Sequence, residues 1–188
     1  MPLISTTAKT SGSHPINIAT VRVLNGRMGI TFCPGKKQRG AMSGDWDRDL
    51  DIDLMAIREW GADHLITLIE DHEITALGVE ALPCKAAVYG LQWHHLPIAD
   101  GQPPNAEFEH QWTLLVPQLR AALGDGASVV VHCKGGLGRA GTVAARLLLA
   151  CDPQLRPDEA MKIIREIRPR AIETLAQEQH LLRLSSLP

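Results

Sequence analysis

The sequence predicts an α/β fold with a central, mostly parallel sheet flanked by helices. A run of β-branched residues at 128–131 is followed by a glycine-rich loop and an apolar segment at 140–150, which is the pattern of a strand, a tight loop and a helix. Strand-like and helix-like segments alternate along the rest of the chain, as they do where helices connect parallel strands. The 188 residues are 45% hydrophobic, which suits one domain with a full-sized core.

The first part of the chain predicts a tail and a hairpin. Residues 1–15 are rich in Ser and Thr, so we expect a flexible tail followed by a single domain at 16–188. Short strands are expected at 18–24 and 28–32, because the Asn25-Gly26 pair between them favours a tight turn.

A basic loop is predicted at 33–44, where Lys36, Lys37 and Arg39 lie among glycines. Such a loop is either simply solvated or placed beside an anion site, where its charge attracts an anionic substrate. A helix is expected at 45–60, because acidic residues crowd its start, as the helix dipole favours, and Gly61 follows it.

Predicted strands and helices alternate in the middle of the chain. Buried strands are expected at 64–69 and 90–96, with a short helical turn at 73–78 between them. Residues 106–123 have apolar side chains at helical spacing, and Pro117 predicts a kink or a break there.

Two more helices are predicted after the central motif. The segment 156–168 begins with good first-turn residues and ends before Pro169. The segment 171–184 forms the last helix, with Thr174 or its neighbour as the N-terminal cap.

The stretch 129–142 contains the residues that carry chemistry. His132 and Cys133 end the strand, and the loop that follows reads Lys134, Gly135, Gly136, Leu137, Gly138, Arg139. Free backbone N–H groups at a helix start form a site for a phosphate-sized anion, and glycines permit the close backbone approach that such a site needs. An arginine fork binds two phosphate oxygens at once.

This position predicts the role of Cys133. A helix N-terminus and a neighbouring cation both stabilise a thiolate, so we expect Cys133 to attack the phosphorus of a bound phosphate ester. A buried cysteine followed by a glycine turn is the alternative, but it gives Arg139 no purpose. A sulfurtransferase loop of the rhodanese type is a second alternative, which the five-residue spacing between Cys133 and Arg139 disfavours.

The loop at 94–104 follows a predicted strand and contains Asp100, Gly101 and three prolines. The carboxyl ends of parallel strands share one edge of a sheet, so this loop is expected beside the cysteine loop. A carboxyl group there can protonate a leaving oxygen, whereas the plain alternative is a turn aspartate before a glycine.

The Cys-x5-Arg motif, preceded by His132, resembles the signature of protein tyrosine and dual-specificity phosphatases. The longer stretches HCKGGLGRAGTVAA and HHLPIADG are similar to the kinase-associated phosphatase (cyclin-dependent kinase inhibitor 3) branch. The resemblance implies the cysteine-phosphatase fold, with Cys133 as nucleophile, Asp100 as general acid, and the loop 134–139 with Arg139 as the phosphate site.

The resemblance also implies supporting residues and shows one departure. His132 is expected to orient the loop through hydrogen bonds. Gln177 is the best match to the glutamine that positions the water of the second step in related phosphatases, and Glu173 stands where some members have another glutamine. Many members have Ser or Thr after the signature arginine to stabilise the departing thiolate, but this chain has Ala140. Either Thr142 replaces that hydroxyl or the second step is slow.

Composition excludes several other classes of function. A net charge of −2 provides no basic field for nucleic acid, and no stretch reaches the length of a membrane span. The four cysteines lack zinc-site and disulfide-framework spacing, so no metal and no cofactor is predicted, and a cytoplasmic location is expected.

The predicted function is therefore a cysteine-dependent phosphomonoester hydrolase, of dual specificity because no motif for a deep tyrosine pocket surrounds the sole Tyr89. The resemblance implies a phosphorylated protein as partner, such as a protein kinase. Two alternatives stay open, namely a small-molecule or phosphoinositide phosphatase and a slow, phosphate-binding interaction module.

Overall fold

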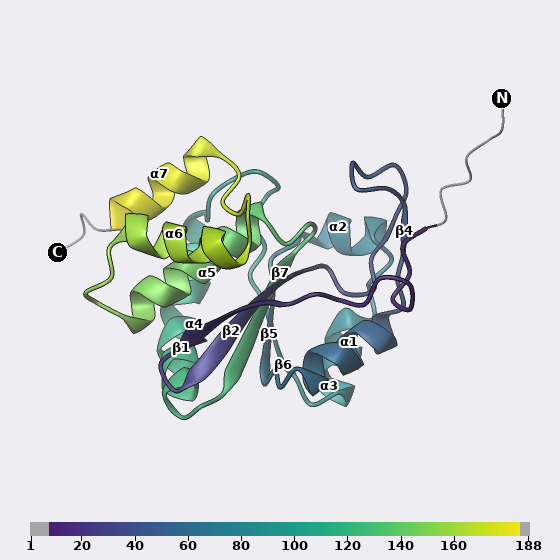
Figure 1. The fold of residues 1–188 in the computed structure, drawn as a ribbon, viewed down its shortest axis with the longest axis horizontal. Helices are drawn as coiled ribbons and strands as arrows, with labels where there is room; N and C mark the ends of the chain where they lie inside the picture. Colours follow the sequence, from purple (N-terminus) through teal and green to yellow (C-terminus); the bar gives the residue numbers. More distant parts are fainter. Residues whose placement is uncertain (1–7, 185–188) are drawn as a thin grey trace.

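A computed structural model describes residues 8–184 of the chain, and residues 1–7 and 185–188 lie outside this description. Five strands form one sheet in the order β1-β2-β7-β5-β6 (Figure 1). Within this sheet, only the β1–β2 pair is antiparallel and the other pairs are parallel, which confirms the predicted fold class. The strands are β1 (Ala19–Val23), β2 (Gly26–Phe32), β5 (His64–Thr67), β6 (Gln92–His95) and β7 (Ser128–Cys133).

Helices cover both faces of this sheet (Figure 1). One face packs against α4, α5, α6 and α7, and the other packs against α1 and α3. The helices are α1 (Leu50–Glu59), α2 (Asp71–Ala76), α3 (Leu82–Val88), α4 (Ala106–Gly124), α5 (Gly138–Cys151), α6 (Pro157–Ile167) and α7 (Leu175–Arg183).

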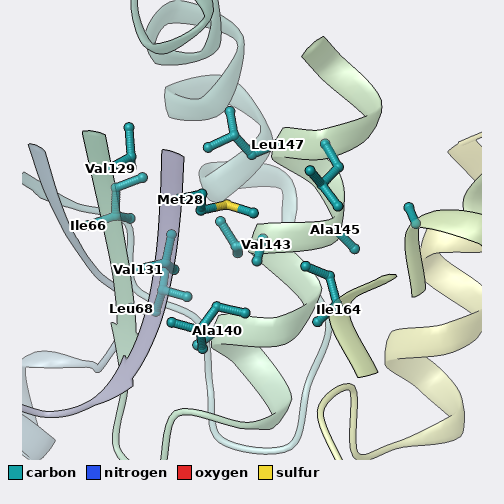
Figure 2. Close-up of a cluster of buried hydrophobic side chains, with 14 of the residues drawn as sticks. Met28, Ile66, Leu68, Val129, Val131, Ala140, Val143, Ala145, Leu147 and Ile164 are labelled. Carbon is teal, nitrogen blue, oxygen red and sulfur yellow. The ribbon is translucent and has the colours of Figure 1, made fainter. Parts of the chain in front are cut away.

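The central unit is β7 followed by α5. Every residue of β7 is buried, as expected of a middle strand covered on both faces. In Figure 2, Val143 and Leu147 of α5 lie between the sheet residues Met28 and Val131 and the α6 residue Ile164. Because this packing fixes both elements, the loop between them has a defined shape at the carboxyl edge of the sheet.

The predicted helix at 45–60 is wrong at its start. Asp49 caps the helix by accepting a hydrogen bond from the Ile52 N–H at 3.0 Å, so the helix begins at Leu50. The preceding residues form β4 (Trp46–Asp47), which pairs with β3 (Lys37–Gln38). The predicted basic loop is therefore partly a two-stranded hairpin.

Other element boundaries also differ from the prediction. The helix α3 was not predicted, and Pro117 neither breaks α4 nor ends it. The last helix begins at Leu175 instead of 171, and Thr174 is its cap, as expected. Residues 171–174 instead form an irregular segment, in which Ile172 has a φ of 61°.

Residues 8–15, which belong to the segment expected to be a loose tail, are bonded to the domain. Lys9 forms a β-bridge with Trp46, and the buried hydroxyl of Ser11 accepts a hydrogen bond from the Asp49 N–H at 2.9 Å. The guanidinium of Arg48 donates to the His14 carbonyl at 2.7 Å. This part of the segment therefore packs against the start of α1.

Candidate active site

Residues 134–139 after β7 form the phosphate loop, and the space that this loop encloses is called the cradle. One glycine of the loop lies directly against the neighbouring strand. Gly136 has a φ of 67°, and a Cβ on it would lie 2.5 Å from the carbonyl carbon and oxygen of Thr31. Only glycine fits this position without moving β2. The strand register pairs Phe32 with Cys133, so the cysteine begins the loop at the edge of the sheet.

Cys133 lies at the base of this cradle with 3% of its surface exposed. Its Sγ accepts a hydrogen bond from the Gly136 N–H at 3.3 Å. A backbone donor aimed at the sulfur stabilises a negative charge there. The structure thus places Cys133 as the sequence predicts for a nucleophile.

His132 is fully buried beside the cysteine and connects two strands. Its Nε2 lies 2.7 Å from the Thr67 hydroxyl, and its Nδ1 lies 3.3 Å from the Cys133 carbonyl oxygen. Burial lowers the pKa of His132 to about 4, so the ring is neutral near neutral pH. Its contacts are those of a residue that orients the loop.

Arg139 is held by a residue that the sequence did not identify. Its Nη1 and Nη2 donate to the two carboxylate oxygens of Glu73 at 2.6 and 2.9 Å. Nη1 also donates to the Ile98 carbonyl at 2.9 Å. No described residue accepts a hydrogen bond from Nε, so that N–H stays available for a phosphate oxygen.

The charges of this pair stabilise each other in a buried place. Burial alone would raise the pKa of Glu73. The hydrogen bonds from Arg139 and from the Glu70 N–H, together with the positive charges of Arg139 and Lys134, outweigh that effect and lower the pKa. Burial alone would likewise lower the pKa of Arg139, and Glu73 and Cys133 raise it. The only sequence signal for Glu73 was its place in a predicted helical turn after a buried strand.

Asp100 reaches the same place from the loop after β6. Its Oδ1 lies 3.1 Å from Arg139 Nη2, and its side chain is 70% exposed. The Thr174 hydroxyl donates to the Gly101 carbonyl at 3.1 Å, and Gln177 Nε2 donates to the Gln102 carbonyl at 3.3 Å. The cap and first turn of α7 therefore support the loop that brings Asp100 to the cradle.

Comparison with known proteins agrees with this geometry. The DSP-PTPase phosphatase domain of the Swiss Army Knife proteins (PTP-SAK) matches residues 45–181. The chain belongs to the dual-specificity and protein tyrosine phosphatase family.

Relatives within this phosphatase family include cyclin-dependent kinase inhibitor 3. The rat protein is 29% identical over 155 residues, which cover 82% of this chain and 69% of the relative. A crystal structure of kinase associated phosphatase with its catalytic cysteine replaced by serine has a TM-score of 0.81 and 25% identity, and covers 92% of this chain and 96% of that one. Tk-PTP in its active form has a TM-score of 0.68 at 24% identity, covers 90% of this chain and 98% of that one, and shows the fold. The predicted resemblance is confirmed.

Gln177, the candidate for positioning water, and Glu173 both lie beside Gly138 at the start of α5. A Cβ built on Gly138 would be 2.6 Å from the Glu173 carboxylate and 3.1 Å from the Gln177 amide. Gln177 Oε1 also accepts hydrogen bonds from the N–H groups of Glu173 and Thr174 at 2.9 and 3.3 Å. The structure brings both residues to the cradle, with Gln177 fixed by the cap of α7.

The side chain of Thr142 is buried in the first turns of α5. Its hydroxyl donates to the Gly138 carbonyl one turn back, at 2.8 Å, and the hydrogen bond that Cys133 Sγ receives comes from Gly136. The Thr142 hydroxyl is therefore bonded within its own helix, which favours the alternative of a slow second step. The reason is helical geometry, which directs a threonine hydroxyl toward the carbonyl four residues earlier.

The basic hairpin also differs from its expected use. Lys37 is exposed and paired with Asp47 at 2.6 Å, whereas Lys36 is buried and donates to the Lys134 carbonyl at 3.2 Å. Lys36 therefore contacts the phosphate loop itself and does not face incoming substrate.

Two general properties complete the description of residues 8–184. Within this range, no helix combines the length and apolar character that crossing a membrane requires. Within the same range, no three His, Cys, Asp or Glu side chains gather as a metal site.

Proposed function

We propose that this protein is a cysteine-dependent phosphomonoester hydrolase that acts as a dual-specificity protein phosphatase. The observation that carries the proposal is the convergence of Cys133, Arg139 and Asp100 on one cradle, from β7, α5 and the loop after β6. Family membership supports the class of reaction.

The geometry supports two chemical steps. In the first, the Cys133 thiolate attacks phosphorus, the bond from phosphorus to the leaving oxygen breaks, and Asp100 gives that oxygen its proton. The loop N–H groups and Arg139 stabilise the charge that spreads over the equatorial oxygens. In the second, water attacks the phosphocysteine, Asp100 accepts its proton, and the sulfur–phosphorus bond breaks to release phosphate.

A phosphorylated protein is the proposed substrate class. The relatives named cyclin-dependent kinase inhibitor 3 and kinase associated phosphatase carry a protein kinase in their names, which supports a phosphorylated kinase as one candidate. Phosphopeptides carrying phosphoserine, phosphothreonine or phosphotyrosine, compared with inositol phosphates, test this choice. Faster release of phosphate from the inositol phosphates would support a small-molecule or phosphoinositide substrate instead.

The first experiment measures phosphate release from an aryl phosphate in the presence of EDTA. We expect turnover by the wild type, none by Cys133→Ser, and a loss of about 100-fold or more in Asp100→Asn, the size of a general acid's contribution. Loss of wild-type activity on chelation would contradict the metal-free scheme. Phosphate binding without any release would instead identify an interaction module.

A further inference from the structure

Three consecutive carbonyl groups of the phosphate loop, those of Lys134, Gly135 and Gly136, accept hydrogen bonds from outside the loop. The Lys134 carbonyl accepts from Lys36 Nζ at 3.2 Å and from the Cys33 N–H at 3.3 Å. The Gly135 and Gly136 carbonyls accept from Arg168 Nη2 and Nε at 3.2 and 2.9 Å. Two cationic side chains from separate elements therefore bind three consecutive carbonyls of the loop.

Lys36, which binds the Lys134 carbonyl, is a buried cation between two aromatic rings. It is 4% exposed, and its Nζ lies 4.2 Å from the centre of the Trp46 ring and 5.1 Å from that of Phe32. Aromatic faces stabilise a cation that burial has removed from water. The β3–β4 hairpin, which supplies Trp46, thus keeps a buried ammonium group against the loop.

Arg168 holds the other side. It is the cap residue directly after α6, and Pro169 follows it. Its half-buried guanidinium uses two of its N–H groups in a fixed fork on neighbouring carbonyls, an arrangement that lysine's single ammonium group does not reproduce. The end of α6 is therefore fastened to the loop at two points.

Each carbonyl that is fixed outward fixes an N–H inward, because a peptide group is planar and trans. The peptide between Gly135 and Gly136 shows this directly, since its C=O binds Arg168 and its N–H donates to Cys133 Sγ at 3.3 Å. A cation on the carbonyl also polarises the peptide and strengthens its N–H as a donor.

We infer that Lys36 and Arg168 are positioning residues of the phosphate loop, which act through the loop carbonyls to aim the N–H groups at the thiolate and at a bound oxyanion. The inference rests on the proposed function but is separable from it, because the affinity for an oxyanion does not require turnover. Neither residue needs to touch substrate for this role.

The test compares Lys36→Met and Arg168→Met with matched controls that remove one positive charge nearby. Lys37→Met is the first control, because Lys37 is exposed and bonds to Asp47 and Arg48 instead of the loop. Arg170→Met is the second, because Arg170 is exposed and makes no hydrogen bond with the part of the chain described here. Tungstate affinity and kcat/KM on an aryl phosphate are measured for each.

We expect both quantities to fall by about 10- to 100-fold in the two test variants, the loss typical of a charge-assisted hydrogen bond. Controls within about twofold of the wild type would complete the expected result. Unchanged tungstate affinity in the test variants would overturn the inference. Equal losses in the controls would also overturn it, because the effect would then be general attraction of anions.

A second pair of variants tests the inference if the methionine variants do not fold. Arg168→Lys keeps the charge but cannot bridge both carbonyls, so its tungstate affinity is expected to fall, whereas Arg170→Lys is expected to bind as the wild type does. Equal affinities in this pair would overturn the inference. If the wild type releases no phosphate from any ester, the proposed function fails, and tungstate binding still decides the role of Arg168.

Discussion

The carboxylate of Glu73 and the guanidinium of Arg139 form two parallel hydrogen bonds, at 2.6 and 2.9 Å, beneath the phosphate loop. The two residues are 66 positions apart in the chain. Glu73 also accepts a hydrogen bond from the Glu70 N–H at 2.9 Å, which begins α2. One carboxylate therefore fixes both the helix start and the plane in which the arginine presents its free N–H.

Glu73→Gln is expected to lower both stability and catalysis. Removing one member of a buried ion pair leaves the other charge uncompensated, which costs about 3–5 kcal/mol of the free energy of unfolding. Arg139 would also lose its fixed plane, so kcat/KM should fall by about tenfold or more. Urea denaturation and steady-state kinetics measure these effects, with the exposed Glu80→Gln as control. A stable, fully active variant would show that Ile98 and Asp100 suffice to hold the arginine.

Gly136→Ala is expected to disrupt the loop. The added Cβ would lie 2.5 Å from the Thr31 carbonyl, and the φ of 67° costs a residue with a Cβ about 1–2 kcal/mol in addition. Gly135→Ala is the matched control, because a Cβ there meets nothing within 4 Å. Turnover and tungstate affinity should fall in the first variant alone. Similar losses in both variants would mean that the loop tolerates neither side chain for a reason other than this contact.

The second chemical step is expected to be slow. The buried Ala140 has no hydroxyl, and the Thr142 hydroxyl is bonded to the Gly138 carbonyl, so no hydroxyl of either residue assists the departing thiolate. Rapid mixing with an aryl phosphate should show a burst of the alcohol followed by slower turnover. Ala140→Ser should raise the rate of the slow phase. Linear release of the alcohol from the first turnover would contradict this prediction.

Stability is expected to fall in mild acid because the buried His132 and the half-buried His94 are neutral. Burial lowers the pKa of His132 and, with help from His64, that of His94 from 6.5 to about 4. As the pH falls from 6.5 to 4, the unfolded chain binds protons that the folded chain does not, so the free energy of unfolding decreases over that window. In urea denaturation, His94→Gln should reduce this decrease, whereas a substitution of the exposed His72 should not. An unchanged decrease in His94→Gln would exclude His94 as a source.

Activity is expected to fall on the alkaline side as Lys36 loses its proton. Burial lowers the pKa of Lys36 from 10.5 to about 8; the neighbouring Cys33 and Cys133 oppose this shift, and Arg48 and Lys134 add to it. Above that pH the ammonium charge on the Lys134 carbonyl disappears. Arginine keeps its charge, so the ratio of wild-type to Lys36→Arg kcat/KM should decrease above about pH 8. A ratio independent of pH would assign any alkaline loss to another group.

Local patterns were enough to predict the centre of the site. The β-branched run, the glycines and the apolar segment after Arg139 specify a strand, a loop and a helix through interactions between near neighbours, and they placed Cys133 correctly at the loop. The position of Asp100 at the same sheet edge as the cysteine loop followed from the rule that the carboxyl ends of parallel strands share one edge. The start of α1 was missed because an acidic run fits both a hairpin and a helix start, and only pairing with β3 decided between them.

The sequence by itself therefore determined the fold class, the loop that carries the candidate nucleophile and the position of the candidate general acid. Only the tertiary structure decided what supports them, namely Glu73 under Arg139, Lys36 and Arg168 on the loop carbonyls, and Gly138 as the neighbour of Gln177. These contacts join residues that lie 32 to 98 positions apart. No periodicity along the chain encodes such pairs, because the strand order and the packing of helices on the two faces bring them together.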